Sequence, residues 1–430
     1  MKLKSLKLKS MNLKSLKQLA AVCTLTISSG AFAATELVIQ YPYGGSFKDT
    51  FSQIQEKFER ANPDIKLKFR APYENYEDAS QKVMRESIIQ QLPDVSFQGL
   101  NRVRPLVDRN IAVSLETFIA AEAEFDKNGY HKAMLDIGTY NKEVYGLPFA
   151  VSLPIAYYNM DLVRAAGWDE DQLPTTWDQV IALSQKIDAL GEDTTGLSYG
   201  WQITGNWLWQ APVFSQGGSM LTKDEKTVAF DGEAGRWAID TLARFVTEGG
   251  MRNYSLSGSK QAFYSGNAGI WVWSTSNVTN AEEMIGDKFE MKTHQFPGIK
   301  AGGMLPAGGN AAIMLTKDAD KQQAAWKFIK FATSGEGAAI VAKTTGYMPP
   351  NKKANELYLQ DFYASHPNNQ VAVSQLPLMT DWYSFPGKNG LKITRVIFNH
   401  LQSIASGERA GEPDAVLAEM TKDVQKLLPR

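Results

Sequence analysis

The chain has 430 residues, 43% of them hydrophobic and 21% charged, which is ordinary for a globular protein with room for two or more domains. Six of its 45 basic residues are lysines in the first 17 positions. The rest of the chain keeps 39 basic residues against 46 acidic ones, a formal charge of −7. This acidic balance argues against nucleic acid or anionic lipid as a partner.

The first 33 residues are typical of a secretory signal peptide. The lysine-rich start contains no acid, Leu19–Gly30 is a short apolar segment, and Ala31-Phe32-Ala33 matches a small-x-small cleavage site. The apolar segment is too short to span a membrane. We therefore predict that residues 1–33 are removed and that the mature protein is periplasmic, with an uncleaved amphipathic helix or a lipid anchor on Cys23 as alternatives. Cleavage would remove Cys23, the only cysteine, and with it any disulfide or thiol nucleophile.

The order of elements after this segment predicts a parallel sheet. Residues 36–41 and 64–70 are predicted strands, and residues 47–62 between them form a predicted helix with apolar side chains three and four positions apart. Strand, helix and strand in this order are typical of a βαβ unit, so the expected fold class is α/β.

The stretch from Tyr145 to Trp168 is the most informative in the chain. An apolar run reaches Asn159 and then becomes a short amphipathic helix that ends at Gly167. Because the run contains Pro148 and Pro154, it cannot be a regular central strand throughout. We interpret it as a buried, extended segment that crosses between two lobes.

The remaining chain continues the alternation of strands and helices. The segment 201–218 is rich in aromatic and amide side chains and is expected as a loop after a strand. Helices are predicted at 76–91, 177–190, 232–249, 324–334 and from 393 onward, strands at 95–97 and 196–201, and a helix-to-strand element at 262–270.

Several short motifs, in the correct order along the mature chain, resemble family 1 of the bacterial extracellular solute-binding proteins that feed ABC importers. The glycerol-3-phosphate and sugar-binding type is the most similar. The motifs are Phe58 with Asn62-Pro63 and Ile65, Pro93-Asp94-Val95, Gly146-x-Pro148 with Tyr157-Tyr158-Asn159, Pro174 to Asp178, Phe263 to Ile270 ending on Trp273, Phe296-Pro297-Gly298, Gly308-Gly309 and Gly346-Tyr347-Met348-Pro349.

This resemblance implies a two-lobed, type II-like periplasmic binding protein fold with a ligand cleft between the lobes. The expected lobes are residues 34–145 plus 292–345 and residues 146–291 plus 346–430, joined near 145–154, Phe296 and Gly346. It also implies a monomer that captures a small solute by hinge closure and delivers it to the membrane permease subunits of an ABC transporter with a cytoplasmic ATPase.

Sugar-like ligands need aromatic faces for their C–H surfaces and hydrogen-bonding groups for their hydroxyls. Aromatic side chains near predicted strand ends are candidates for the first role, whereas Trp168, Trp237 and Trp326 are interpreted as core residues on helical faces. The candidates are Tyr41, Tyr43, Tyr76, Trp201, Trp207 and Tyr347.

Among the charged residues, Arg395 is the strongest candidate for ligand binding, because it lies in an otherwise apolar helix start. A guanidinium can bind phosphate or carboxylate in a bidentate way. An inter-lobe ion pair and a solvated arginine are the alternatives. Resemblance to glycerol-phosphate binders implies a site lined by Tyr76, Ser152, Ser274, Gly309, Tyr347 and Arg395. Where such binders have an acidic residue after the third strand, this chain has 98–101, QGLN. We therefore expect a sugar or polyol-type solute, with glycerol 3-phosphate or another organophosphate as the alternative.

Enzyme classes find little support in the sequence. It contains no P-loop, GxGxxG or HExxH pattern, and its four histidines have no metal-ligand spacing. Glu74, Glu77 and Asp78 could serve a secreted glycoside hydrolase, but acids at a helix N-terminus are explained by the helix dipole. We therefore expect a binding protein without cofactor or metal.

Overall fold

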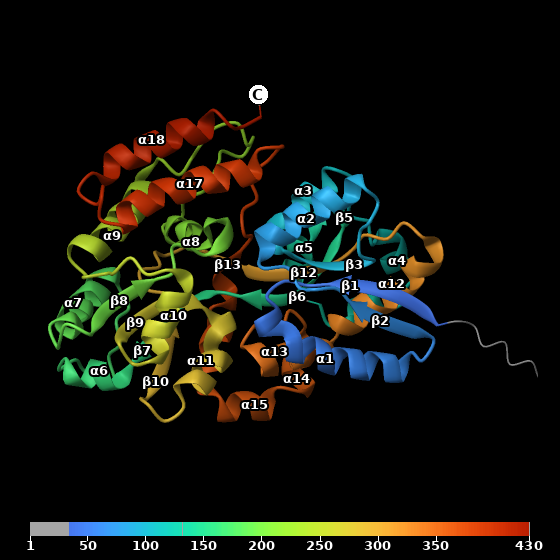
Figure 1. Ribbon diagram of the computed structural model, residues 1–430, viewed down its shortest axis with the longest axis horizontal. Coiled ribbons are helices and arrows are strands. Elements are labelled where there is room, and N and C mark those ends of the chain that lie inside the picture. The colour runs from blue at the N-terminus through green and yellow to red at the C-terminus, as the bar shows by residue number, and fades with distance from the viewer. Residues whose placement is uncertain (1–33, 131, 430) are drawn as a thin grey trace, which may run out of the picture. The chain divides into compact units, whose positions relative to one another are not determined.

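The computed structural model describes residues 34–130 and 132–429 (Figure 1). The predicted signal peptide, residues 1–33, lies outside these ranges. The unit Thr35–Arg430, which contains the two larger sheets, is described here by itself. No helix within the described ranges has both the length and the apolar character needed to span a bilayer.

The first sheet has five strands in the order β2-β1-β3-β12-β6 (Figure 1). Their bounds are Thr35–Gln40 for β1, Ile65–Phe69 for β2, Val95–Gly99 for β3, Gly146–Ser152 for β6 and Gly308–Met314 for β12. β1 pairs in parallel with β2 and β3, whereas β12 is antiparallel to β3 and β6. The predicted βαβ unit is confirmed, because α1, Gly44–Ala61, connects β1 and β2 in sequence.

α1 packs on this sheet through one apolar face. Phe47, Phe51, Ile54 and Phe58 recur every three or four residues and are all buried. Phe51 stacks on Phe149 of β6 with ring centroids 5.3 Å apart. The helix ends before the Asn-Pro pair at 62–63, where proline cannot continue a helix.

The second sheet has four strands in the order β10-β7-β9-β8. Their bounds are Pro154–Asn159 for β7, Thr195–Tyr199 for β8, Ala268–Ser274 for β9 and Met291–Gln295 for β10. β8 is parallel to β9, whereas β7 is antiparallel to both of its neighbours.

The apolar run from Gly146 to Asn159 contributes one strand to each sheet. Pro148 lies in β6, which is an edge strand, and Pro154 is the first residue of β7, so both prolines occupy positions where a missing N–H is tolerated. The chain passes from one sheet to the other at Leu153, as expected of a crossing segment.

The strand pairings assign the segments beside two expected lobe boundaries to sheets. Residues 146–152 pair with β12 in the first sheet, and residues 291–295 pair with β7 in the second. Residues on both sides of Leu153 thus belong to different sheets, and the expected lobe boundaries stay predictions.

The expected loop at 201–218 is instead largely helical. A short 3-10 turn, Thr204–Asn206, leads into α8, Trp207–Ser215, and every residue of α8 is buried. A helix that is buried on all sides has no polar face, so its sequence lacks the periodicity that identifies surface helices. The prediction of a loop was wrong for this reason.

The other helices surround the two sheets, with α9, α17 and α18 packed together near the C-terminus (Figure 1). Helix α6 after β7 confirms the predicted short helix. The bounds are α2 Tyr76–Ile88, α3 Val103–Val107, α4 Glu116–Ala120, α5 Lys132–Ile137, α6 Met160–Ala165, α7 Trp177–Asp188, α9 Glu233–Thr247, α10 Leu256–Tyr264, α11 Val278–Ile285, α12 Ala319–Ala332, α13 Gly335–Thr345, α14 Lys352–Leu357, α15 Gln360–Ser365, α16 Pro367–Ser374, α17 Gly390–Ala405 and α18 Pro413–Gln425. Two short pairings of two residues each complete the strands, β4 Thr139–Tyr140 with β5 Glu143–Val144 and β11 Leu305–Pro306 with β13 Met379–Thr380.

We expect Ile54→Ala to lower the free energy of unfolding by about 2–4 kcal/mol, because Ile54 is fully buried between α1 and the sheet. Gln53→Ala, one residue earlier on the exposed face, should change it by less than about 0.5 kcal/mol. Urea denaturation measures both. Equal losses for the two variants would contradict the packing described here.

Candidate ligand-binding site

A cavity of about 370 Å³ lies at the ends of strands from both sheets. Its lining includes residues from the carboxyl ends of β6 and β9, from the loops after β1 and β8, and from the start of β12. Crevices beyond the carboxyl ends of strands are the usual ligand sites of α/β folds, and the volume is within the range of small-molecule pockets. Eight sequence-predicted residues line it: Tyr43, Tyr76, Ser152, Trp207, Ser274, Gly309, Tyr347 and Arg395.

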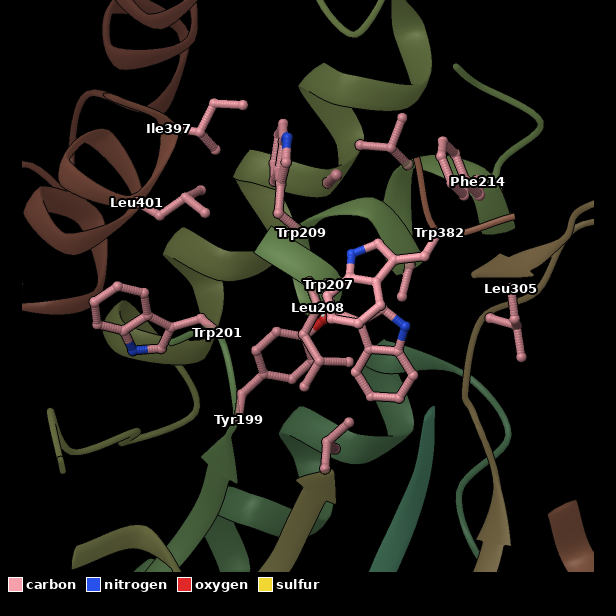
Figure 2. Close-up of a cluster of buried hydrophobic side chains, with 14 of the residues drawn as sticks. Tyr199, Trp201, Trp207, Leu208, Trp209, Phe214, Leu305, Trp382, Ile397 and Leu401 are labelled. Carbon is pink, nitrogen blue, oxygen red and sulfur yellow. Dashed lines mark hydrogen bonds between the residues drawn. The ribbon is translucent and has the colours of Figure 1, made fainter. Parts of the chain in front are cut away.

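Two predicted residues, Tyr41 and Trp201, do not line this cavity. Tyr41 follows β1 and stacks on Phe51 in the core, with ring centroids 4.1 Å apart. Trp201 packs against Phe398 at 5.1 Å and is only 3% exposed. Figure 2 shows Trp201 on the side of Tyr199 and Leu401, apart from Trp207. The structure therefore places both side chains outside the lining of this cavity.

A buried group of tyrosines forms one wall of the cavity. The hydroxyl oxygens of Tyr76 and Tyr347 are 3.2 Å apart, and the Asn310 amide donates to Tyr76 Oη at 3.2 Å. Tyr43 meets Tyr76 edge to face at 5.0 Å. Burial raises the pKa of Tyr76 and Tyr347, so both hydroxyls stay neutral and can donate or accept hydrogen bonds.

Glu77 connects α2 to the loop after β8. Its carboxylate accepts hydrogen bonds from Arg102 at 2.8 Å and from the backbone N–H of Gly205 at 3.2 Å. The Arg102 side chain is only 3% exposed. The start of α2 is ordered by Asn75, whose side chain accepts from the N–H groups of Glu77 and Asp78. The charge of Glu77 is therefore already paired at the cavity wall.

Two non-glycine residues in left-handed backbone conformation face the cavity. Tyr43 has φ 54° immediately before α1, and Asn206 has φ 56° immediately before α8. The Asn206 amide donates to the Thr394 carbonyl at 3.0 Å, and its buried Oδ1 has no hydrogen-bond partner among the described residues. Such strained conformations are concentrated at functional sites, where packing holds a side chain in place.

Sequence reasoning missed Trp382 and Asn206 and did not assign Trp273 or Lys260 to the site, although all four line the cavity. Trp382 donates its Nε1–H to the Gly205 carbonyl at 3.3 Å, and its ring lies 6.2 Å from that of Trp207 (Figure 2). Two signals were available: Trp273 ends the helix-to-strand motif, and Asn206 lies in the aromatic- and amide-rich segment 201–218. No local pattern indicated Trp382 or Lys260.

Arg395 lies on α17 with its side chain exposed and its guanidinium 5.1 Å from the ring centroid of Phe398. No carboxylate lies within ion-pair distance of Arg395 in the described residues, so the alternative of an inter-lobe ion pair finds no partner. Over the same ranges, no group of three or more His, Cys, Asp or Glu side chains could hold a metal ion.

Residues 53–371 match the family described as bacterial extracellular solute-binding protein, and the chain belongs to this family. It is 24% identical over 431 residues to the sn-glycerol-3-phosphate-binding periplasmic protein UgpB of Yersinia pseudotuberculosis, covering 95% of both chains.

The fold is that of two-lobed periplasmic binding proteins. UgpB from Mycobacterium tuberculosis, solved in complex with glycerophosphocholine, is similar with a TM-score of 0.82 and 20% identity, over 92% of this chain and 98% of that one. The GacH receptor of Streptomyces glaucescens, solved without ligand and with acarbose, gives a TM-score of 0.77 at 18% identity over the same shares.

Gly309→Ala should disturb the cavity wall. Gly309 has φ +112°, and an added Cβ would lie 1.9 Å from the carbonyl oxygen of Ala150 in β6. We expect a loss of more than about 2 kcal/mol of unfolding free energy, because a backbone collision adds to the conformational strain. Gly302→Ala is the control, since Gly302 has φ +78° with nothing within 4 Å of the added atom. It should cost about 1 kcal/mol. Thermal unfolding of both variants distinguishes collision from strain.

Proposed function

We propose that this protein is the periplasmic solute-binding component of an ABC import system, and that it captures a polyol-type solute and delivers it to a membrane permease. The cavity carries this proposal: it combines aromatic faces, hydroxyl groups and the Arg395 guanidinium from segments belonging to both sheets. Aromatic faces and convergent hydrogen-bonding groups are the features that recognise sugars and polyols.

A phosphate ester of such a polyol fits the charges at the cavity best. Glu77 is paired with Arg102, whereas Arg395 has no carboxylate partner among the described residues. Ser152, Ser274 and Tyr347 add hydroxyl groups to the same cavity. Guanidinium and hydroxyl donors suit phosphate oxygens. The names of the similar proteins, which bind sn-glycerol 3-phosphate or were solved with glycerophosphocholine, are consistent with this ligand class.

A neutral saccharide is the second candidate, favoured by the rings of Trp207, Trp273 and Trp382 at the cavity. A hydrolase has weaker support. Of its candidate carboxylates, Glu77 binds Arg102, and Asp78 binds Lys82 at 2.8 Å and the backbone N–H of Glu74 at 3.0 Å. These contacts give both acids a structural role.

Closure of the lobes on the ligand is the proposed mechanism. A ligand buried between the lobes stabilises the closed form by its higher affinity for that form, which the permease then recognises. Small-angle scattering should show a more compact protein when a binding ligand is added. An unchanged scattering profile in the presence of a saturating ligand would contradict hinge closure.

An ion pair supports such a closed form. Arg104 of α3 donates from Nη1 and Nη2 to the two carboxylate oxygens of Glu225, each at 2.6 Å, and the Tyr383 hydroxyl donates to Glu225 Oε1 at 3.0 Å. Arg104 and Glu225 belong to different expected lobes. The hydrogen bonds from Arg104 lower the pKa of Glu225, so the pair is complete at neutral pH and is lost only as acidification passes below the usual glutamate range.

The ligand class can be tested by thermal shift with sn-glycerol 3-phosphate, glycerophosphocholine, glycerol and maltose. A ligand at about 100 times its Kd should add roughly 2.7 kcal/mol to the unfolding free energy. We expect stabilisation by the phosphate esters and a loss of affinity of about tenfold or more in Arg395→Gln. Lys392→Gln, exposed on the same helix and absent from the cavity lining, is the control. Stabilisation by maltose alone, unchanged in Arg395→Gln, would favour the saccharide candidate.

Arg104→Gln and Glu225→Gln should each weaken ligand binding about fivefold, the equivalent of roughly 1 kcal/mol for a partly exposed ion pair. The double variant should lose no more than either single one, since the pair is broken in all three. Titration calorimetry with the tightest ligand of the thermal screen measures these affinities. Arg244→Gln, whose partners Asp178 and Glu248 share its expected lobe, should bind like the wild type. Additive losses would show that the ion pair does not act in closure.

A further inference from the structure

A second cationic side chain, Lys260, lines the cavity in addition to Arg395. It belongs to α10, where Leu256, four residues earlier, lines the cavity as well. The neighbouring Ser259 fixes the helix against the second sheet: its Oγ accepts from Trp271 Nε1 at 2.9 Å and lies 2.8 Å from Ser198 Oγ. The direction in which α10 presents Lys260 is therefore set by buried contacts.

The Lys260 ammonium lies 5.7 Å from the ring centroid of Trp273. That ring is held on both sides, because it stacks on Trp271 with centroids 4.9 Å apart and donates its Nε1–H to Asn277 Oδ1 at 2.8 Å. Trp273 and Asn277 also line the cavity. Lys260 thus stands beside a rigid aromatic wall of the ligand site.

Comparison with other lysines of the described chain shows that Lys260 lacks a counter-charge. Lys82, Lys186 and Lys330 also lie over an aromatic ring. Lys82 pairs with Asp78, Lys330 pairs with Glu122, and Lys186 is exposed to water. Lys260 is partly buried, and no carboxylate lies within ion-pair distance of it in the described residues.

A partly desolvated ammonium without a counter-charge is costly, and an anionic ligand group would remove that cost. The burial of Lys260 also lowers its pKa. The carboxylates at the cavity are Glu74, just before α2, and Glu77, in the first turn of α2, and Glu77 is neutralised by Arg102. Neither is within 4 Å of Lys260, so the charge that completes this position is not supplied by the described chain.

We propose that Lys260 and the Trp273 ring form an anion-binding subsite, in which the Lys260 ammonium binds a phosphate or carboxylate oxygen of the solute. Lys260 then determines specificity together with Arg395, and favours anionic solutes over neutral sugars of the same size. The inference rests on the function proposed above, because it concerns the ligand of the same cavity.

Titration calorimetry with sn-glycerol 3-phosphate and with maltose, at one ionic strength, tests the subsite in the wild type and in Lys260→Gln, Lys260→Arg and Lys186→Gln. Lys260→Gln should lose about tenfold or more in affinity for glycerol phosphate, Lys260→Arg should retain most of it, and Lys186→Gln should match the wild type. Maltose affinity, where present, should not fall in any variant. The ligand-free melting temperature of Lys260→Gln should be unchanged or higher, whereas a merely structural lysine would lower it when replaced.

The outcomes separate this inference from the proposed function. Equal glycerol phosphate affinity in the wild type and Lys260→Gln would overturn the subsite and leave solute binding intact. Binding of maltose but not of glycerol phosphate by the wild type would also overturn the subsite and leave solute binding intact. Binding of neither compound would overturn the proposed ligand class, and the subsite with it.

Discussion

The buried segment from Gly146 to Asn159 connects the two halves of the structure, because it supplies a strand to each sheet. At its midpoint, Leu153 lies between the two sheets and belongs to neither, so its backbone N–H and C=O have no strand partner. Thr275 satisfies both, accepting from Leu153 N through Oγ1 at 3.2 Å and donating its own N–H to Leu153 O at 3.0 Å. Buried backbone groups need such partners, so the crossing depends on this contact.

The cavity follows from that crossing. Ser152 ends β6 and pairs with Gly308, while Pro154 begins β7 and pairs with Ser274, the last residue of β9. The two serines therefore reach the cavity from strands of different sheets on either side of Leu153. A ligand that contacts both would be sensitive to the relative position of the sheets, which is the geometric requirement for coupling binding to hinge motion.

The charges around the cavity fall into two kinds. Glu77 and Arg102 neutralise each other and link α2 to the loop after β8. Lys260 on α10 and Arg395 on α17 have no carboxylate partner within ion-pair distance in the described chain. In the Glu77–Arg102 pair each charge already has its counter-charge, whereas a cation without one is stabilised by an added anion. This difference separates the residues that organise the site from those available to a solute.

The sequence by itself determined the α/β class, most helices and strands, the crossing segment and the family, because each is expressed in local periodicity, proline positions or short motifs. It also indicated eight cavity residues, since strand ends and motif glycines mark where α/β crevices form. It failed where burial removes the pattern, as in α8, and could not separate Trp201 in the core from Trp207 at the cavity. Only the tertiary structure decided that Trp382, Asn206 and Lys260 meet at the cavity. The hydrogen bonds of Asn206 and Trp382 join residues 188 and 177 positions apart in the sequence. Such contacts depend on packing, which no local pattern records.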